Sequence, residues 1–227
     1  MIGIFDSGKG GLCALYELRR RYPMADVAFL ADRRNAPYGT KTKPELIRLV
    51  TSNVKRLKAA GADKILMACC TAGTVYDLLP QEVRDACIPI ISPTASAAAA
   101  ATKNGKIGVI ATEATVASHA FSDILRAYPT VKEVTELPLQ PLVKMIEDGC
   151  EDGATDEQSR RKIYSLLAPL KAEGVDTLVL GCTHFPLLYR TIEGFMSGAR
   201  LISSAKEGAL EMLKYAENKG RSKTLYL

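Results

Sequence analysis

Two cysteines occupy equivalent positions in an internal repeat of the chain. Residues 57–69, LKAAGADKILMAC, align without gaps to residues 170–182, LKAEGVDTLVLGC, so Cys69 and Cys182 each follow an aliphatic segment. Two thiols that face a bound molecule from opposite sides suit inversion of a stereocentre, because one removes the α-proton and the other returns a proton on the far face. The repeat therefore predicts a two-base site built from these two cysteines.

A thiol suits this chemistry because positive dipoles or neighbouring groups can lower its ordinary pKa of about 8.5 toward neutrality. Both cysteines are expected at strand ends that lead into helices, where backbone N–H groups favour a thiolate and also substrate carboxylates. The remaining cysteines without a counterpart in the repeat, Cys13, Cys87 and Cys150, are expected to be inert apolar residues.

The same sulfur atoms could instead bind a metal. Cys69, Cys70, Cys182 and His184 offer four zinc-type ligands, but vicinal cysteines and a Cys-x-His step fit the usual ligand spacings poorly, and no metal is expected. A redox centre would use a Cys-x-x-Cys motif, which is absent. The six cysteines lie in a chain of 227 residues without a secretory signal, so reduced thiols are expected rather than disulfides.

A glycine-rich segment, Asp6-Ser7-Gly8-Lys9-Gly10-Gly11, ends the first predicted strand and opens a helix. It lacks the spacing of a P-loop, but its N–H groups can bind a carboxylate. Asp6 could hold a substrate ammonium, tune a nearby thiol or cap the helix. His184 lies two residues from Cys182, and this position suits a histidine that tunes the thiol.

Short aliphatic segments alternate with helical patterns along the chain. Helices are predicted over residues 44–60, where Pro44 suits a first turn, and over residues 156–172, where Thr155 and Gln158 have capping-box spacing. This alternation predicts an α/β fold of mostly parallel sheets flanked by helices. The predicted strands are Ile2–Phe5, Val27–Leu30, Ile65–Ala68, Ile88–Ile91, Ile107–Ile110, Val131–Thr135, Leu178–Leu180 and Leu201–Ile202.

The repeat also predicts how these elements are arranged. Each copy ends a helix at a glycine, Gly61 or Gly174, where a left-handed conformation is expected, and a third strand follows at Ile90–Pro93 and at Leu201–Ser204. We therefore expect two similar lobes related by a pseudo-two-fold axis, with a boundary near residues 92–96. Parallel sheets bind ligands beyond the carboxyl ends of their strands, which places the site between the lobes.

Composition excludes several classes of protein. No apolar run reaches the length of a membrane span, and the first residues lack the pattern of a signal peptide, so we expect a cytoplasmic protein whose mature chain begins at Met1. The net charge of +5 is mild, and the short arginine runs lack interleaved aromatic residues. The chain contains no tryptophan. We expect no nucleic-acid partner.

Five segments resemble motifs of glutamate racemases, the cofactor-independent branch of the aspartate/glutamate racemase family. They are FDSGKGG at 5–11, APYGTK at 36–41, ACCTA at 68–72, ATEATVAS at 111–118 and DTLVLGCTHFPLL at 176–188, in family order over nearly the whole chain. The resemblance implies a two-lobed enzyme that interconverts L- and D-glutamate without a cofactor, by a two-thiol mechanism, and supplies D-glutamate for peptidoglycan.

The resemblance also implies roles for residues. Residues 1–93 and 204–227 would form the first lobe and residues 94–203 the second. The expected partner is a small amino-acid substrate, and a homodimer is left open. Cys69 and Cys182 resemble the two bases, and Asp6 and His184 resemble the groups that assist them. Positions matching substrate contacts are Ser7, Pro37, Tyr38, Gly39, Cys70, Thr71 and Thr183.

Three positions depart from the family pattern. Cys70 replaces the usual Asn, Lys144 stands where a PLVE motif has its glutamate, and Ser203 replaces the aspartate of an LIDSA motif. An amide both donates and accepts hydrogen bonds, whereas a thiol does both weakly. These departures support two alternatives: a racemase for aspartate or another acidic amino acid, and a two-lobed binding protein that retains the fold without the chemistry.

Overall fold

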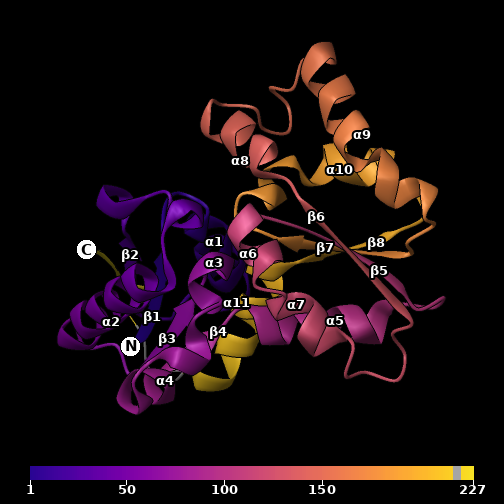
Figure 1. Cartoon of the computed structure of the whole chain (residues 1–227). Coiled ribbons are helices and arrows are strands. Elements are labelled where there is room, and N and C mark those ends of the chain that lie inside the picture. Colours follow the sequence, from indigo (N-terminus) through magenta and orange to yellow (C-terminus); the bar gives the residue numbers. More distant parts are fainter. Residues whose placement is uncertain (217–220) are drawn as a thin grey trace.

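The computed structural model describes residues 1–216 and 221–227, which form two parallel β-sheets flanked by helices (Figure 1). In the described residues, the first sheet has the strand order β4-β3-β1-β2-β9 and the second has the order β6-β5-β7-β8. The predicted α/β class is confirmed. No helix of the described residues has the length and apolar character to cross a membrane.

The first sheet is built from the beginning of the chain and from its last residues. Its strands are β1 (Ile2–Asp6), β2 (Val27–Ala31), β3 (Lys64–Met67), β4 (Cys87–Pro89) and β9 (Thr224–Tyr226). The helices that follow its strands are α1 (Gly11–Arg21), α2 (Lys43–Ala59), α3 (Cys70–Gly73) and α4 (Gln81–Ala86).

The second sheet is formed by residues from the middle of the chain. Its strands are β5 (Lys106–Ala111), β6 (Glu133–Pro138), β7 (Thr177–Gly181) and β8 (Arg200–Ser203). The accompanying helices are α5 (Ile91–Ala101), α6 (Glu113–Ala117), α7 (Ala120–Leu125), α8 (Gln140–Glu147), α9 (Glu157–Ala172), α10 (Tyr189–Phe195) and α11 (Ser204–Met212).

The two sheets repeat one topology. The order β4-β3-β1-β2 of the first sheet corresponds strand by strand to β8-β7-β5-β6 of the second. The register repeats as well, because Ile2 pairs with Lys64 in β3 and Ile107 pairs with Thr177 in β7. Both copies of the helix-to-strand turn contain a glycine with positive φ, 92° at Gly61 and 70° at Gly174. The sequence repeat is thus a repeat of three-dimensional structure.

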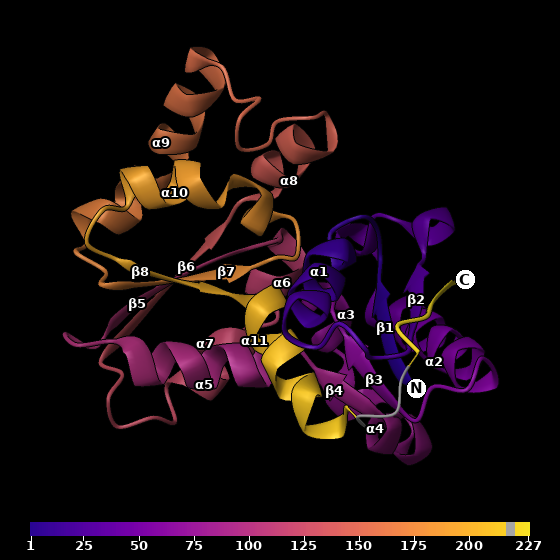
Figure 2. The same cartoon turned by 180° about the vertical axis from the view of Figure 1, so that it is seen from behind.

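A shared apolar core fixes the sheets relative to each other. One face of the first sheet, including Ile4 and Phe29, and one face of the second, including Val109 and Val179, belong to a single buried cluster with α1, α5 and α11. Helix α11 packs against both α1 and α5, and it lies between the two sheets in Figures 1 and 2. The division into lobes at residues 93/94 and 203/204 stays a prediction.

Several predicted boundaries were wrong. The segment Ile90–Pro93 is not a strand: β4 ends at Pro89, which has no N–H to donate to a ladder, and α5 begins at Ile91 with Pro93 in its first turn. The sixth strand lies two to three residues later than predicted, because Val131 is held in a turn by a bond from its N–H to the Tyr128 carbonyl.

Two further details differ at helix and strand ends. Thr155 does not cap the helix of residues 156–172; Asp156 does, with its carboxylate accepting from the N–H of Ser159 at 2.7 Å. Strand β9 was not predicted, and it adds to the first sheet beside β2 through pairing of Val27 with Thr224.

Candidate active site

A cavity of about 680 Å³ opens where the carboxyl ends of both sheets meet. It receives side chains from the segments that follow β1, β2, β3, β5, β6 and β7, as expected for ligand sites of parallel sheets. Its lining comprises Ser7, Gly8, Lys9, Arg33, Ala36, Pro37, Tyr38, Gly39, Cys69, Cys70, Thr71, Thr112, Gln140, Val143, Lys144, Glu147, Asp148, Gly181, Cys182, Thr183 and His184. Every sequence-predicted site residue except Asp6 lines this cavity.

Cys69 reaches the cavity from the first sheet. It follows β3 and is the N-cap residue of α3, and the backbone N–H of Ala72 in that helix turn bonds to its sulfur. The thiol donates to the Ser7 hydroxyl at 3.5 Å. Cys69 is only 5% exposed, and it lines the cavity.

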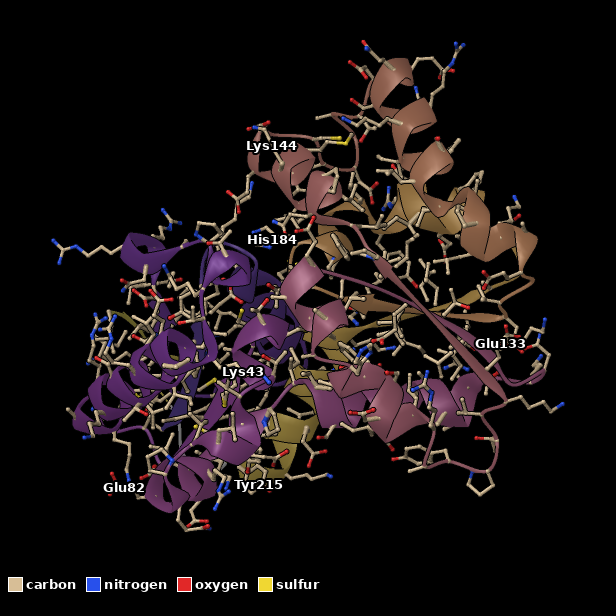
Figure 3. The ribbon with its side chains drawn as sticks, in the orientation of Figure 1. Lys43, Glu82, Glu133, Lys144, His184 and Tyr215 are labelled. Carbon is tan, nitrogen blue, oxygen red and sulfur yellow. The ribbon has the colours of Figure 1, made fainter. Side chains whose placement is uncertain are left out.

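Cys182 reaches the cavity from the second sheet, one residue after β7. Its sulfur lies 3.6 Å from Nδ1 of His184, and Nε2 of the same imidazole lies 2.5 Å from a carboxylate oxygen of Glu147. An ionised carboxylate only accepts hydrogen bonds, so Nε2 carries the proton and Nδ1 of the neutral ring is free to accept from the thiol. Figure 3 shows His184 between the elements around the first sheet and those around the second sheet, which form the two halves of the molecule.

The backbone N–H groups expected to favour thiolates do lower both thiol pKa values, but burial outweighs them. Burial, reinforced by the negative charge of Asp6, raises the pKa of Cys69 to about 11 despite its bonds to Ser7 and to backbone N–H groups. Burial also raises the pKa of Cys182, against the lowering effect of a hydrogen bond from the backbone N–H of His184. Neutral pH therefore leaves both groups as thiols until a neighbour accepts a proton or a cation binds.

Asp6 lies beneath the cavity, fully buried at the end of β1. Its carboxylate accepts from the Gly8 N–H at 2.8 Å and from the Thr183 hydroxyl at 3.1 Å, which ties the two halves together. Burial raises its pKa, and the hydrogen bonds from Gly8 and Thr183 oppose that rise. Gly10 packs directly on Thr183, where an added Cβ would lie 2.3 Å from the hydroxyl oxygen.

The segment with Pro37, Tyr38 and Gly39 forms one cavity wall after β2. The Tyr38 hydroxyl donates to Asp32 at 2.6 Å and accepts from Asn53 at 2.9 Å, so it is turned away from the cavity and only the rest of the residue can meet a ligand. Hydrogen bonds from Tyr38 and its neighbours outweigh burial and keep the pKa of Asp32 low.

Thr71, Thr183 and Cys70 complete the predicted contacts. The Thr71 hydroxyl is 3.0 Å from that of Thr112, which caps α6 in the other half. Burial strongly raises the pKa of Cys70, so this thiol is neutral. Thr183 lines the cavity, but its hydroxyl proton is donated to Asp6.

Two of the three departures from the family pattern have a structural explanation. Lys144 is a largely exposed residue of α8 at the rim of the cavity, where it pairs with Asp148 at 2.9 Å (Figure 3). Glu147, one turn further along the helix, contacts His184. Ser203 does not line the cavity; it is the N-cap of α11, a position that serine and aspartate both favour.

Sequence reasoning missed several lining residues. Glu147 was detectable in principle, because residues 144 and 147 share a helix face, but the segment 140–147 was not assigned a helix. Lys9, Thr112 and Gln140 come from three different elements, and only the folded chain brings them to one cavity. All six cysteines are free thiols, and among the described residues no group of three or more His, Cys, Asp or Glu side chains is arranged to hold a metal ion.

Comparison with known proteins decides the family. The model of the family described as Asp/Glu/Hydantoin racemase matches residues 26–212. This chain belongs to that racemase family. The glutamate racemase of Aquifex aeolicus is 34% identical over 96% of this chain and 84% of its own length. That of Mycobacterium leprae is 37% identical over 94% of this chain and 78% of its own length.

Solved racemase structures share the fold. The glutamate racemase RacE1 of Bacillus anthracis matches with a TM-score of 0.85 at 32% identity, covering 100% of this chain and 86% of that one. The Francisella tularensis glutamate racemase, solved in complex with D-glutamate, matches with a TM-score of 0.86 at 26% identity, covering 99% and 86%. An aspartate racemase of Picrophilus torridus, at 21% identity and a TM-score of 0.68, shares the fold.

Proposed function

We propose that this racemase interconverts L- and D-glutamate by a cofactor-independent two-thiol mechanism. One observation carries the proposal: Cys69 and Cys182 end equivalent strands of the two sheets and open into the same cavity. An amino acid bound there would have one sulfur on each side of its α-carbon. The glutamate racemases among its relatives support the choice of substrate.

The Cys182 side contains its own proton acceptor. In one direction, the Cys182 proton moves to Nδ1 of His184, and the imidazolium is held by the Glu147 carboxylate at Nε2. The resulting thiolate removes the α-proton, and the electron pair of the broken C–H bond stays on the substrate as a carbanion. The Cys69 thiol then gives its proton to the opposite face, which leaves Cys69 as the thiolate.

The reverse direction begins from thiolate at Cys69. The Ser7 hydroxyl and backbone N–H groups of Ser7 and Ala72 favour that thiolate, whereas burial and Asp6 oppose it. A substrate ammonium in the cavity adds a positive charge that favours a thiolate on either side. Asp6 and Thr183 act here by fixing the loop that carries Ser7.

The charges around the cavity suit an acidic amino acid. Arg33 and Lys144 line it beside the acidic residues Glu147 and Asp148, and the N-terminal ends of α3 and α6 adjoin it, whereas the Lys9 ammonium is already held by Ile146 and Glu151. Positive helix ends and cations both favour carboxylates. We place the reaction in the cytoplasm, where its product D-glutamate would enter peptidoglycan synthesis.

A panel of enantiopure amino acids followed by circular dichroism tests this function. We expect the circular dichroism signal to decay to zero from either L-glutamate or D-glutamate, because both end as the same racemic mixture. Aspartate and glutamine should be turned over at least about tenfold more slowly. Aspartate ranking first would replace glutamate as the substrate. Saturable glutamate binding without any loss of optical activity would show a binding protein.

A further inference from the structure

One side chain of the loop after β1 contacts the other half of the molecule. Lys9 stands in the FDSGKGG segment, and its ammonium group donates to the carbonyl of Ile146 at 2.9 Å and pairs with Glu151 at 3.4 Å. Its side chain is 28% exposed and borders the cavity. These bonds connect the first sheet to α8, a helix of the second half.

The contact is made at the end of α8, next to Glu147. The Ile146 carbonyl already accepts from the backbone N–H of Gly149 at 3.0 Å, and the Lys9 ammonium is its second donor. The last carbonyls of a helix carry partial negative charge, so a lysine ammonium is a favourable partner there. Ile146 immediately precedes Glu147, whose carboxylate contacts His184. An atom added at Gly8 as Cβ would lie 4.0 Å from that carboxylate, so the loop also abuts Glu147 itself.

A small movement of this helix end would alter the Cys182 side of the site. The Glu147 carboxylate accepts from Nε2 of His184 and so fixes which imidazole nitrogen carries the proton, and the other nitrogen faces Cys182 at 3.6 Å. If Glu147 withdraws, the ring can rotate or change tautomer, and the thiol loses an aligned acceptor. The bond from Lys9 to the Ile146 carbonyl can therefore affect proton transfer at Cys182, through Glu147 and His184.

We propose that Lys9 is a positioning residue that holds the end of α8 so that Glu147 orients His184 toward Cys182. The catalytic part of this inference rests on the proposed racemase function. Lys9 acts through the Ile146 carbonyl and Glu147, and takes no part in transferring the α-proton. The loop that supports Cys69 through Ser7 thereby also aligns the opposite thiol.

The test compares Lys9→Met, Lys9→Arg and Lys171→Met in the full chain. Lys171 is a matched control, since its ammonium donates to the Phe195 carbonyl at the end of α10 at 2.6 Å, away from the cavity. We expect Lys9→Met to lower kcat about tenfold with KM changed less than about threefold, since misplacing a supporting group by about 1 Å can cost up to about 100-fold. Lys9→Arg should retain most of kcat, and Lys171→Met should behave like the unmodified protein.

A spectroscopic readout does not depend on turnover. The chain has two histidines, so ¹⁵N labelling of histidine gives few signals, with exposed His119 as internal reference. We expect His184 to show protonated Nε2 and unprotonated Nδ1, and to become a mixture of tautomers in Lys9→Met. A change in these signals without measurable glutamate turnover would retain the positioning role and reject the proposed function.

Other outcomes would overturn the inference. An increase in KM of tenfold or more with kcat unchanged would make Lys9 a substrate-binding residue. Unchanged His184 signals in Lys9→Met would show that α8 keeps its place without Lys9. Equal losses of kcat in Lys9→Met and Lys171→Met would show that the loss does not come from the contact between Lys9 and α8.

Discussion

The two thiol positions have the same origin in the fold but different supporting groups. Cys69 and Cys182 follow equivalent strands, β3 and β7, in sheets of the same strand order. Around Cys69 the partners are the Ser7 hydroxyl and the N–H groups at the start of α3. Around Cys182 the partners are an imidazole and, beyond it, the carboxylate of Glu147.

This difference shows that the repeated fold accounts for the two sulfur atoms but not for the groups that assist them. The repeat supplies two sulfur atoms on opposite walls, which inversion of a stereocentre needs. Proton transfer at each sulfur needs only local assistance, and that assistance can differ in chemistry. Because L- and D-glutamate have equal free energies in solution, kcat/KM must be equal in both directions, whereas kcat and KM separately can reflect the asymmetry.

The largest expected effect comes from removing either thiol. We expect Cys69→Ala and Cys182→Ala each to lower the rate of racemisation by at least about 10³-fold, because each reaction direction needs both a base and an acid. The double variant should be little worse than either single one, since the two groups act as a unit. Loss of optical activity from L-glutamate measures the rate.

Cys87→Ala serves as the control, because Cys87 is similarly buried in β4 but does not line the cavity. It should retain activity. Undiminished turnover in either Cys69→Ala or Cys182→Ala would remove the two-thiol mechanism.

A smaller effect is expected from Glu147→Gln. The amide keeps the size of the side chain but loses the charge that holds His184, so we expect kcat to fall about 10- to 100-fold, in line with other supporting groups one contact away from the reacting group. Glu157→Gln, at the exposed start of α9, should have no effect.

The same variant sharpens the comparison between the two sides. Glu147→Gln should lower the rate at which Cys182 is alkylated, because His184 then accepts the thiol proton less readily. The alkylation rate of Cys69 should stay unchanged. Mass spectrometry of the labelled peptides measures both rates. Equal changes at both cysteines would mean that Glu147 supports the whole cavity and not one side of it.

The smallest effect concerns the pH dependence of Cys69. Only the thiolate is alkylated, so with a pKa of about 11 its alkylation rate should keep rising with pH through the range where an ordinary thiol has levelled off. The negative charge of Asp6 raises that pKa, so Asp6→Asn should shift the curve to lower pH and accelerate alkylation at about pH 8 by roughly two- to fivefold. A shift to higher pH would mean that Asp6 stabilises the thiolate.

The repeat made much of the site predictable. Equivalent positions identified Cys69 rather than Cys70 as the counterpart of Cys182, and the strand-helix alternation implied that both lie at carboxyl strand ends. Local rules also sufficed for Gly61 and Gly174, because a helix that ends at a glycine before a strand needs only short-range geometry.

The rest depended on long-range contacts. Glu147 and Lys9 are ordinary polar residues in the sequence, and their roles arise from how α8 lies against the loop after β1. The pKa values of the thiols followed the burial of the cavity, which no local pattern reveals. Strand β9 is three residues long and acquires its conformation by pairing with β2.

The most direct measurement follows the α-hydrogen during turnover of L-glutamate in D₂O, stopped below about one-tenth conversion. Two facing thiols predict deuterium at the α-carbon of the D-glutamate formed and ordinary hydrogen in the remaining L-glutamate, because the acid that protonates the product carries a solvent-derived proton. Starting from D-glutamate, the labels should be reversed. D-glutamate that retains the α-hydrogen of its L-glutamate precursor would contradict the account, since a single base would then have carried the proton from one face to the other.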